Sequence, residues 1–245
     1  MRVPLGIAFS FLSVMAMGQV EQWLPRPDLG NLAEITNEPF SADAITTTVR
    51  TLADGTHITR PALTVKMYRD SAGRTRSDRL PGDPIGGEPP SASIIFIRDP
   101  LAGYSYILDT VNKIAHRTAI ARPQPGQPMN LPNPSAAAPT QEANASEPRG
   151  ETEDLGTQAM EGLTVQGRRT KITYPAGSFG NDRDITNVAE IWSSSELRLM
   201  ILQIHSDPRN GETTTKLENV SRTQPDPSLF MLPPDYQIVD VSAGQ

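Results

Sequence analysis

A histidine, a serine and an aspartate stand side by side at His205, Ser206 and Asp207, and these are the residue types of a serine-hydrolase triad. In such a site the base must lie within hydrogen-bonding distance of the nucleophile. The preceding segment, residues 197–205, is apolar and strand-like, and neighbouring residues of a strand point to opposite faces of a sheet. We therefore interpret the three residues as the end of a strand with its turn. The sequence also lacks the Gly-x-Ser-x-Gly segment that exposes a serine nucleophile in hydrolases.

No other set of residues predicts catalysis, a metal site or a cofactor. The histidines of the chain, His57, His116 and His205, are far apart, and no spacing among them is typical of a metal site. Gly177 and Gly180 are not followed by the Lys-Ser/Thr pair of a phosphate-binding loop. The chain has no cysteine, which excludes disulfides, thiolate metal sites and a cysteine nucleophile. We expect a protein that is not an enzyme and has no cofactor.

The charge balance argues against a nucleic-acid partner. The 245 residues include 22 Lys and Arg against 28 Asp and Glu, which gives a net charge of −6. Binding to nucleic acid needs a concentrated basic surface instead. Aromatic residues make up only 5% of the chain, whereas there are 23 prolines.

The first residues have the pattern of a secretory signal peptide. Arg2 is followed by the apolar residues 3–17, and Ala16 and Gly18 are small residues of the kind that a signal peptidase reads. We predict a signal peptide over residues 1–18, with a retained anchor or a buried helix as alternatives. The later apolar runs span about four residues, far fewer than the roughly 20 that cross a bilayer as a helix. The processed chain is therefore expected to be periplasmic or secreted and to have no transmembrane segment.

Alternation with a period of two, typical of strands, continues through most of the chain. Residues 42–53 are rich in threonine and β-branched residues and are followed by Asp54-Gly55, a strong hairpin-turn signal. Pro61 cannot donate to a ladder and predicts a break or an edge. Further strands are expected over residues 56–69, which include Pro61, and over residues 74–80, 93–98, 104–108, 114–120, 155–160, 163–174, 185–192, 197–205, 212–220 and 236–241, and one helical turn capped by Asp226 over residues 226–230.

These elements predict a mainly β protein of the β-rich α+β class. Tight turns connect antiparallel neighbours, and about ten such strands in one sheet must curl to bury a face. A barrel, a half-barrel and a sandwich all satisfy this requirement. We favour one large curved antiparallel sheet, a half-barrel of about ten strands with few short helices.

A change in composition divides this β domain. Residues 122–152 contain seven prolines and no aromatic residue, and such a segment cannot bury enough apolar surface to offset the entropy of ordering it. We predict a disordered Pro-rich insert here. Residues 42–121 and 153–245 are then the two halves of one domain, and residues 19–41 form an N-terminal extension with a short helix.

Three stretches carry motifs that recur together in one family of bacterial proteins. The hairpin of residues 104–117 has a Tyr-bearing strand and an Asp-led turn, and Glu190 and Trp192 form a Glu-x-Trp strand before the hairpin of residues 207–213. A Ser-Leu-Phe turn then precedes a Pro-x-x-Tyr motif that ends at Tyr236 and leads into the last strand. These stretches resemble the LolA-like superfamily of bacterial lipoprotein-localisation factors, and the resemblance covers roughly residues 42–121 and 153–241. The chain also looks like secreted proteins of soil bacteria such as Acidobacteria.

This resemblance implies a half-open sheet whose concave face holds an acyl chain or an apolar segment. The residues that we expect on such an apolar ligand face are Phe96, Tyr104, Tyr106, Trp192, Leu199 and Ile201. The expected function is that of an exported, non-catalytic binding protein for a lipid, a lipoprotein or an apolar peptide. The alternative is a structural or interaction module of the cell envelope, with a filled core and with the Pro-rich segment as a docking arm for an envelope protein.

Overall fold

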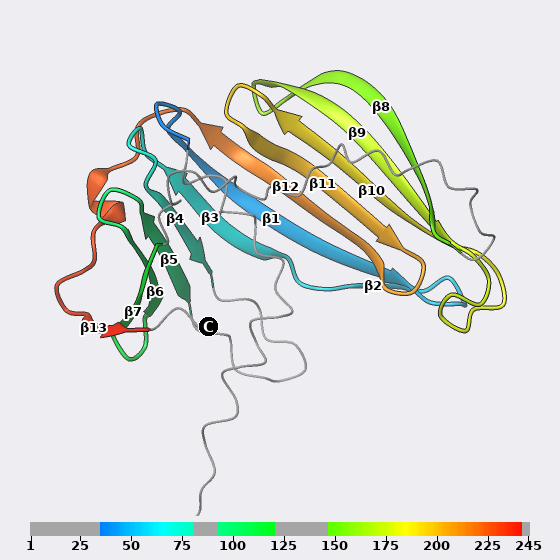
Figure 1. Ribbon diagram of the computed structural model, residues 1–245, viewed down its shortest axis with the longest axis horizontal. Helices are drawn as coiled ribbons and strands as arrows, with labels where there is room; N and C mark the ends of the chain where they lie inside the picture. The colour runs from blue at the N-terminus through cyan, green and yellow to red at the C-terminus, as the bar shows by residue number, and fades with distance from the viewer. Residues whose placement is uncertain (1–34, 81–92, 121–146, 242–245) are drawn as a thin grey trace, which may run out of the picture.

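The computed structural model describes residues 35–80, 93–120 and 147–241. The predicted signal peptide, the N-terminal helix and most of the Pro-rich insert lie outside these residues. The described residues form one 13-stranded sheet. It is large, curved and open, as Figure 1 shows. The strands are β1 (Phe40–Thr51), β2 (His57–Thr59), β3 (Leu63–Arg69), β4 (Thr75–Arg79), β5 (Ile94–Asp99), β6 (Tyr104–Asp109), β7 (Ile114–Ala119), β8 (Arg149–Met160), β9 (Leu163–Tyr174), β10 (Ile185–Ser194), β11 (Leu199–Asp207), β12 (Gly211–Ser221) and β13 (Gln237–Asp240).

The sheet consists of two meanders that are joined in its middle. The strand order is β13-β7-β6-β5-β4-β3-β1-β12-β11-β10-β9-β8, and β2 pairs with the end of β1. β1 pairs antiparallel with β3 on one side and with β12 on the other. The first and last parts of the chain therefore share one sheet. In the strand order, β7 is next to β13 at one end and β8 is at the other end, so the chain between β7 and β8 connects opposite sides of the sheet.

The predicted fold class is confirmed, although the strand count was too low. Pro61 separates β2 from β3, both of which pair with β1. β13 pairs in parallel with β7, which the expectation of antiparallel strands throughout did not include. β8 begins at Arg149, inside the range predicted as insert, because β9 is long enough to pair with it as far as Thr173.

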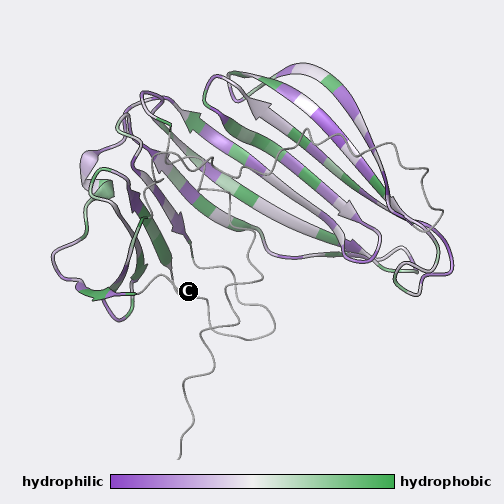
Figure 2. Ribbon diagram, in the orientation of Figure 1, coloured by the Kyte–Doolittle hydropathy of each residue, from purple (hydrophilic) through white to green (hydrophobic). Residues whose placement is uncertain are grey.

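Hydrophobic residues alternate with polar ones along the strands (Figure 2) and pack in two clusters. The smaller cluster has Ile97, Leu108 and Ala115 at its centre, with Leu232 and Tyr236 from the C-terminal segment packed against them. A short 3-10 helix, η2 (Pro227–Phe230), begins that segment. Asp226 caps it by accepting a hydrogen bond from the Ser228 backbone N–H at 2.8 Å, as the sequence predicted.

The larger cluster connects the centre of the sheet with the β8–β11 end. It contains the following buried residues: Ile35, Phe40, Ala42, Ala44, Met67, Leu163, Val165, Trp192, Leu197, Leu199, Ile201 and Leu217. Six of these twelve residues lie on β9, β10 and β11 or in the turn that joins β10 to β11.

Candidate functional site

A cleft forms where strands β9 and β10 separate. Their ladder ends at the pair Gln166 and Ser193. Beyond it, β9 continues to pair with β8 as far as Leu163, whereas β10 continues with β11 as far as Ser194. The ends of the two hairpins thus diverge, which leaves an opening in the sheet.

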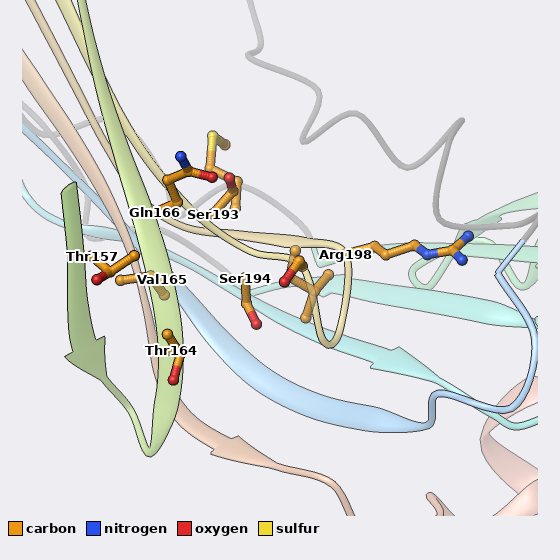
Figure 3. A pocket seen from close by; sticks show the side chains of 10 residues that line it. Thr157, Thr164, Val165, Gln166, Ser193, Ser194 and Arg198 are labelled. Atoms are coloured by element: carbon orange, nitrogen blue, oxygen red, sulfur yellow. The ribbon is translucent and has the colours of Figure 1, made fainter. Parts of the chain in front are cut away.

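The opening has a volume of about 410 Å³, and most of the residues that line it are polar. Its polar lining consists of hydroxyl and amide side chains and one arginine: Thr157, Thr164, Gln166, Ser193, Ser194, Ser195 and Arg198. Val165 and Leu199, which are 0% and 4% exposed, also line it and belong to the larger hydrophobic cluster. Figure 3 shows these side chains arranged around the diverging hairpins. Met200, which is 36% exposed, completes the lining, so the cleft combines polar residues with one exposed methionine and two core residues.

A second, smaller cleft of about 300 Å³ adjoins the first and shares Gln166 and Ser193 with it. Its lining includes Arg168, Asp154 and the exposed Ile191. Asp154 uses one carboxylate oxygen to accept the backbone N–H of Gly156 at 2.8 Å. The two clefts thus lie on either side of the Gln166–Ser193 pair, with which the β9–β10 ladder ends.

Ser194 is the buried serine among the residues that line the cleft. The residue is 1% exposed, and its hydroxyl oxygen is buried and has no hydrogen-bond partner. A buried hydroxyl without a partner is destabilising. The hydroxyl is therefore an unpaired polar group in the lining of the cleft.

The contacts of Trp192 hold β9 and β10 together beside the cleft. The indole N–H donates to a carboxylate oxygen of Glu190 at 2.8 Å, and Arg169 donates to the other oxygen at 2.8 Å. These bonds hold the pKa of Glu190 below its ordinary value, and the bond from Trp192 has the largest effect. The ring also lies against Gly167, the strand partner of Trp192. The β9–β10 ladder is thus fixed right up to the point at which the strands diverge.

Arg69 anchors the turn between β10 and β11 to the centre of the sheet. This arginine is fully buried and stacks on the Phe40 ring at 4.8 Å. It donates hydrogen bonds to the backbone carbonyls of Glu38 and Leu197, both at 2.8 Å. Burial lowers the pKa of Arg69 to about 10, the nearby Glu38 carboxylate opposes this shift, and the positive charge of Arg198 adds to it.

The six residues predicted for an apolar ligand face lie in three places. Trp192, Leu199 and Ile201 pack together in the larger cluster, and of these Leu199 also lines the cleft. Tyr106 packs on the smaller cluster beside Tyr104, with ring centres 6.5 Å apart. Phe96 pairs with Ile107, and therefore faces the side of β5 and β6 opposite to the two tyrosines. Their role in ligand binding remains a prediction.

The hydrolase-like residues are not arranged for catalysis. His205 and Ser206 are adjacent on β11 and pair with different residues of β12, Thr213 and Glu212. The Asp207 carboxylate is bound by Arg209 at 2.7 Å. In the part of the chain that the structure describes, there is no group of three or more His, Asp or Glu residues able to hold a metal ion.

Sequence reasoning did not identify the cleft or Arg69. Residues 193–195 lie between the predicted strands 185–192 and 197–205, and Arg69 is the last residue of another predicted strand. One feature of the sequence indicates that Arg69 is buried. It lies two residues after Met67 on the strand Leu63–Arg69, and therefore on the same face as this core residue.

No protein-family model and no curated protein sequence matches the chain. Among solved structures, the chain is similar to an uncharacterized conserved protein from Thermus thermophilus, with 11% identity, 87% of this chain and 97% of that chain covered, and a TM-score of 0.41. It is similar to the MucA/MucB complex of Pseudomonas aeruginosa, with 12% identity, 88% and 63% covered, and a TM-score of 0.41. A LolA superfamily protein from Nitrosomonas europaea has 7% identity, 84% and 95% covered, and a TM-score of 0.29. The last of these proteins bears the name of the superfamily that the sequence resembles.

Among the described residues, no helix has the length and apolar character needed to span a bilayer.

Proposed function

We propose that this chain is an exported, non-catalytic binding protein that holds the acyl chain of a lipid against its curved sheet, with the cleft between β9 and β10 as the entrance. The observation that supports the proposal is a cleft of about 410 Å³ that is lined both by polar side chains and by Val165 and Leu199, which are part of the core. Ligand sites are concave, and combine an apolar lining with a few polar groups that orient the ligand. A lipid has the matching division into a polar and an apolar part.

The cleft also offers a low-cost way to admit such a chain. Because the β9–β10 ladder ends at Gln166 and Ser193, moving the two hairpin ends apart breaks no ladder hydrogen bond between these strands. Each CH₂ group that leaves water contributes about 0.8 kcal/mol. A lipid chain is favoured over an apolar peptide because a peptide would bring its backbone N–H and C=O groups to the apolar residues Val165 and Leu199, where each needs a partner.

Mass spectrometry tests this function directly. The protein is purified from its native periplasm without detergent, analysed under native conditions, and extracted with organic solvent. We expect a copurified lipid in stoichiometric amount. A bound peptide would replace the proposed ligand, and protein that is repeatedly ligand-free would contradict the proposal.

A matched pair of variants tests the entrance. Ser193 is exposed and lines both clefts, so Ser193→Trp should close them and weaken binding of a fluorescent monoacylglycerol about tenfold or more, which corresponds to about 1.4 kcal/mol. Ser178→Trp adds the same indole at an exposed loop position away from the cleft and should bind normally. Equal binding by both variants would exclude this entrance.

A second candidate, the envelope interaction module, is favoured by one observation. Trp192, Leu199 and Ile201 are all at most 4% exposed, as in a filled core. The docking arm expected for this module lies mostly outside the described residues. Ligand-free protein in the experiment above would select this candidate.

A further inference from the structure

Ser194 differs from the other polar residues that line the cleft between β9 and β10. All the others are exposed, so water hydrates their side chains. Ser194 is 1% exposed, and its Oγ is buried and has no hydrogen-bond partner among the described residues. Burying a hydroxyl without a partner costs stability. The cleft thus contains one polar group whose hydrogen bond neither the described chain nor the solvent around it supplies.

Ser194 is also the first residue of β10 beyond the β9–β10 ladder. That ladder ends at Gln166 and Ser193, whereas Ser194 pairs only with Leu199 of β11. In Figure 3, Ser194 is drawn between Val165 of the β8–β9 hairpin and the turn that joins β10 to β11. Separation of the two hairpin ends therefore opens a path from the cleft to this hydroxyl without breaking a ladder hydrogen bond between β9 and β10.

The surroundings of this hydroxyl are apolar. Val165 and Leu199 line the same cleft, and Leu199, as the cross-strand partner of Ser194, shares a face of the sheet with it. The one charged residue in the described lining is Arg198, whose side chain extends away from the serines and threonines (Figure 3). A charged ligand group beside Ser194 would therefore be buried without a counter-ion, which is unfavourable. The position suits an uncharged hydrogen-bond acceptor at the end of an apolar chain.

We propose that Ser194 Oγ donates a hydrogen bond to the carbonyl oxygen of an acyl ester, whose hydrocarbon chain lies against Val165 and Leu199. A serine hydroxyl donates one hydrogen bond, and an ester carbonyl is an uncharged acceptor bonded directly to the acyl chain. A free fatty acid is disfavoured, because its carboxylate would need a cation beside Ser194. This inference rests on the proposed function and narrows its ligand class to esterified lipids.

Two lipids that differ only in this carbonyl test the proposal. One is a monoacylglycerol, and the other is the monoalkylglycerol of equal chain length, in which an ether CH₂ replaces the C=O. Both are titrated below the concentration at which they form micelles, into the full processed chain and into Ser194→Ala, which removes one oxygen atom. The matched control is Ser195→Ala, because Ser195 is exposed and lines the same cleft.

We expect the parent chain and Ser195→Ala to bind the ester about tenfold more tightly than the ether, which corresponds to about 1.4 kcal/mol. Ser194→Ala should bind the two lipids equally, and the ether at least as tightly as the parent does. The infrared carbonyl band of the bound, isotope-labelled ester should lie at a lower wavenumber in the parent than in Ser194→Ala, because a hydrogen bond weakens the C=O stretch.

The outcomes separate this inference from the proposed function. Equal binding of the two lipids by the parent would overturn the role of Ser194 and would still support the lipid function. An ester preference that persists in Ser194→Ala, or that is lost in Ser195→Ala as well, would also contradict this role. Binding of neither lipid by the parent would overturn the proposed function and this inference together.

Discussion

A Cβ atom added to Gly167 would lie 2.6 Å from the indole ring of Trp192, its partner on the neighbouring strand. The ring occupies the space that any side chain at position 167 would need. Glu190 and Gly167 therefore hold the indole from two directions, next to the end of the β9–β10 ladder. The pairing of β9 with β10 next to the cleft therefore requires a residue without a side chain at position 167.

Gly167→Ala should destabilise the fold by about 1–3 kcal/mol, because the indole must move within a packed core. Gly150→Ala is the control, since a Cβ there meets no atom within 4 Å. Urea unfolding measures both changes. A double variant with Trp192→Leu should recover part of the loss, and additive effects would contradict the proposed overlap.

Arg69→Met should lower the free energy of unfolding by about 3 kcal/mol, because the carbonyls of Glu38 and Leu197 lose their donor. Arg60→Met, at an exposed position, is the control and should have little effect. Hydrogen exchange of the 195–198 turn should increase in the first variant only. Unchanged exchange there would show that Arg69 does not anchor this turn.

Removing the hydroxyl of Ser194 should leave the fold as stable as before or more stable, because its oxygen is buried without a partner. Thr46→Ala is the contrasting variant, since it breaks a 2.9 Å hydrogen bond to Thr215 and should cost about 1 kcal/mol. Chemical unfolding compares the two. A loss for Ser194→Ala as large as that for Thr46→Ala would mean that the hydroxyl has a partner in solution.

Acid should weaken the fold partly through Asp207. Hydrogen bonds from the Arg209 side chain, and then from its backbone N–H, lower the pKa of this carboxyl to about 2. A folded-state pKa below the unfolded value of about 3.9 stabilises the fold above that value, and the stabilisation is lost as the pH falls towards 2.

Asp207→Asn should therefore reduce the difference in the free energy of unfolding between about pH 5 and pH 2 by about 1–2 kcal/mol. This energy is smaller than the pKa shift alone would give, because Arg209 is 41% exposed and solvent screens its charge. Asp182→Asn, at a side chain that is 84% exposed, should leave the acid dependence almost unchanged. Thermal unfolding at several pH values provides the comparison. An identical acid dependence in the two variants would be inconsistent with this role of Asp207.

Local patterns in the sequence predicted much of the fold but not the candidate site. The Asp54-Gly55 turn, the break at Pro61 and the cap at Asp226 depend on a few adjacent residues, and all three are present. The pairing of β1 with β12 and the divergence of β9 from β10 depend on residues far apart in the chain, and no local periodicity encodes them. The contact of Arg69 with the 195–198 turn was not predicted for the same reason.

The position of β1 between β3 and β12 also sets the order of folding. Thr46 and Thr215, which are 169 residues apart, bond across the central seam of the sheet. A ribosome must synthesise nearly the whole polypeptide before β1 can acquire its second neighbour, so the nascent chain keeps an unpaired strand edge until late. Such a high contact order predicts slow folding, and an exposed β1 edge makes the unfinished molecule a natural client for chaperones.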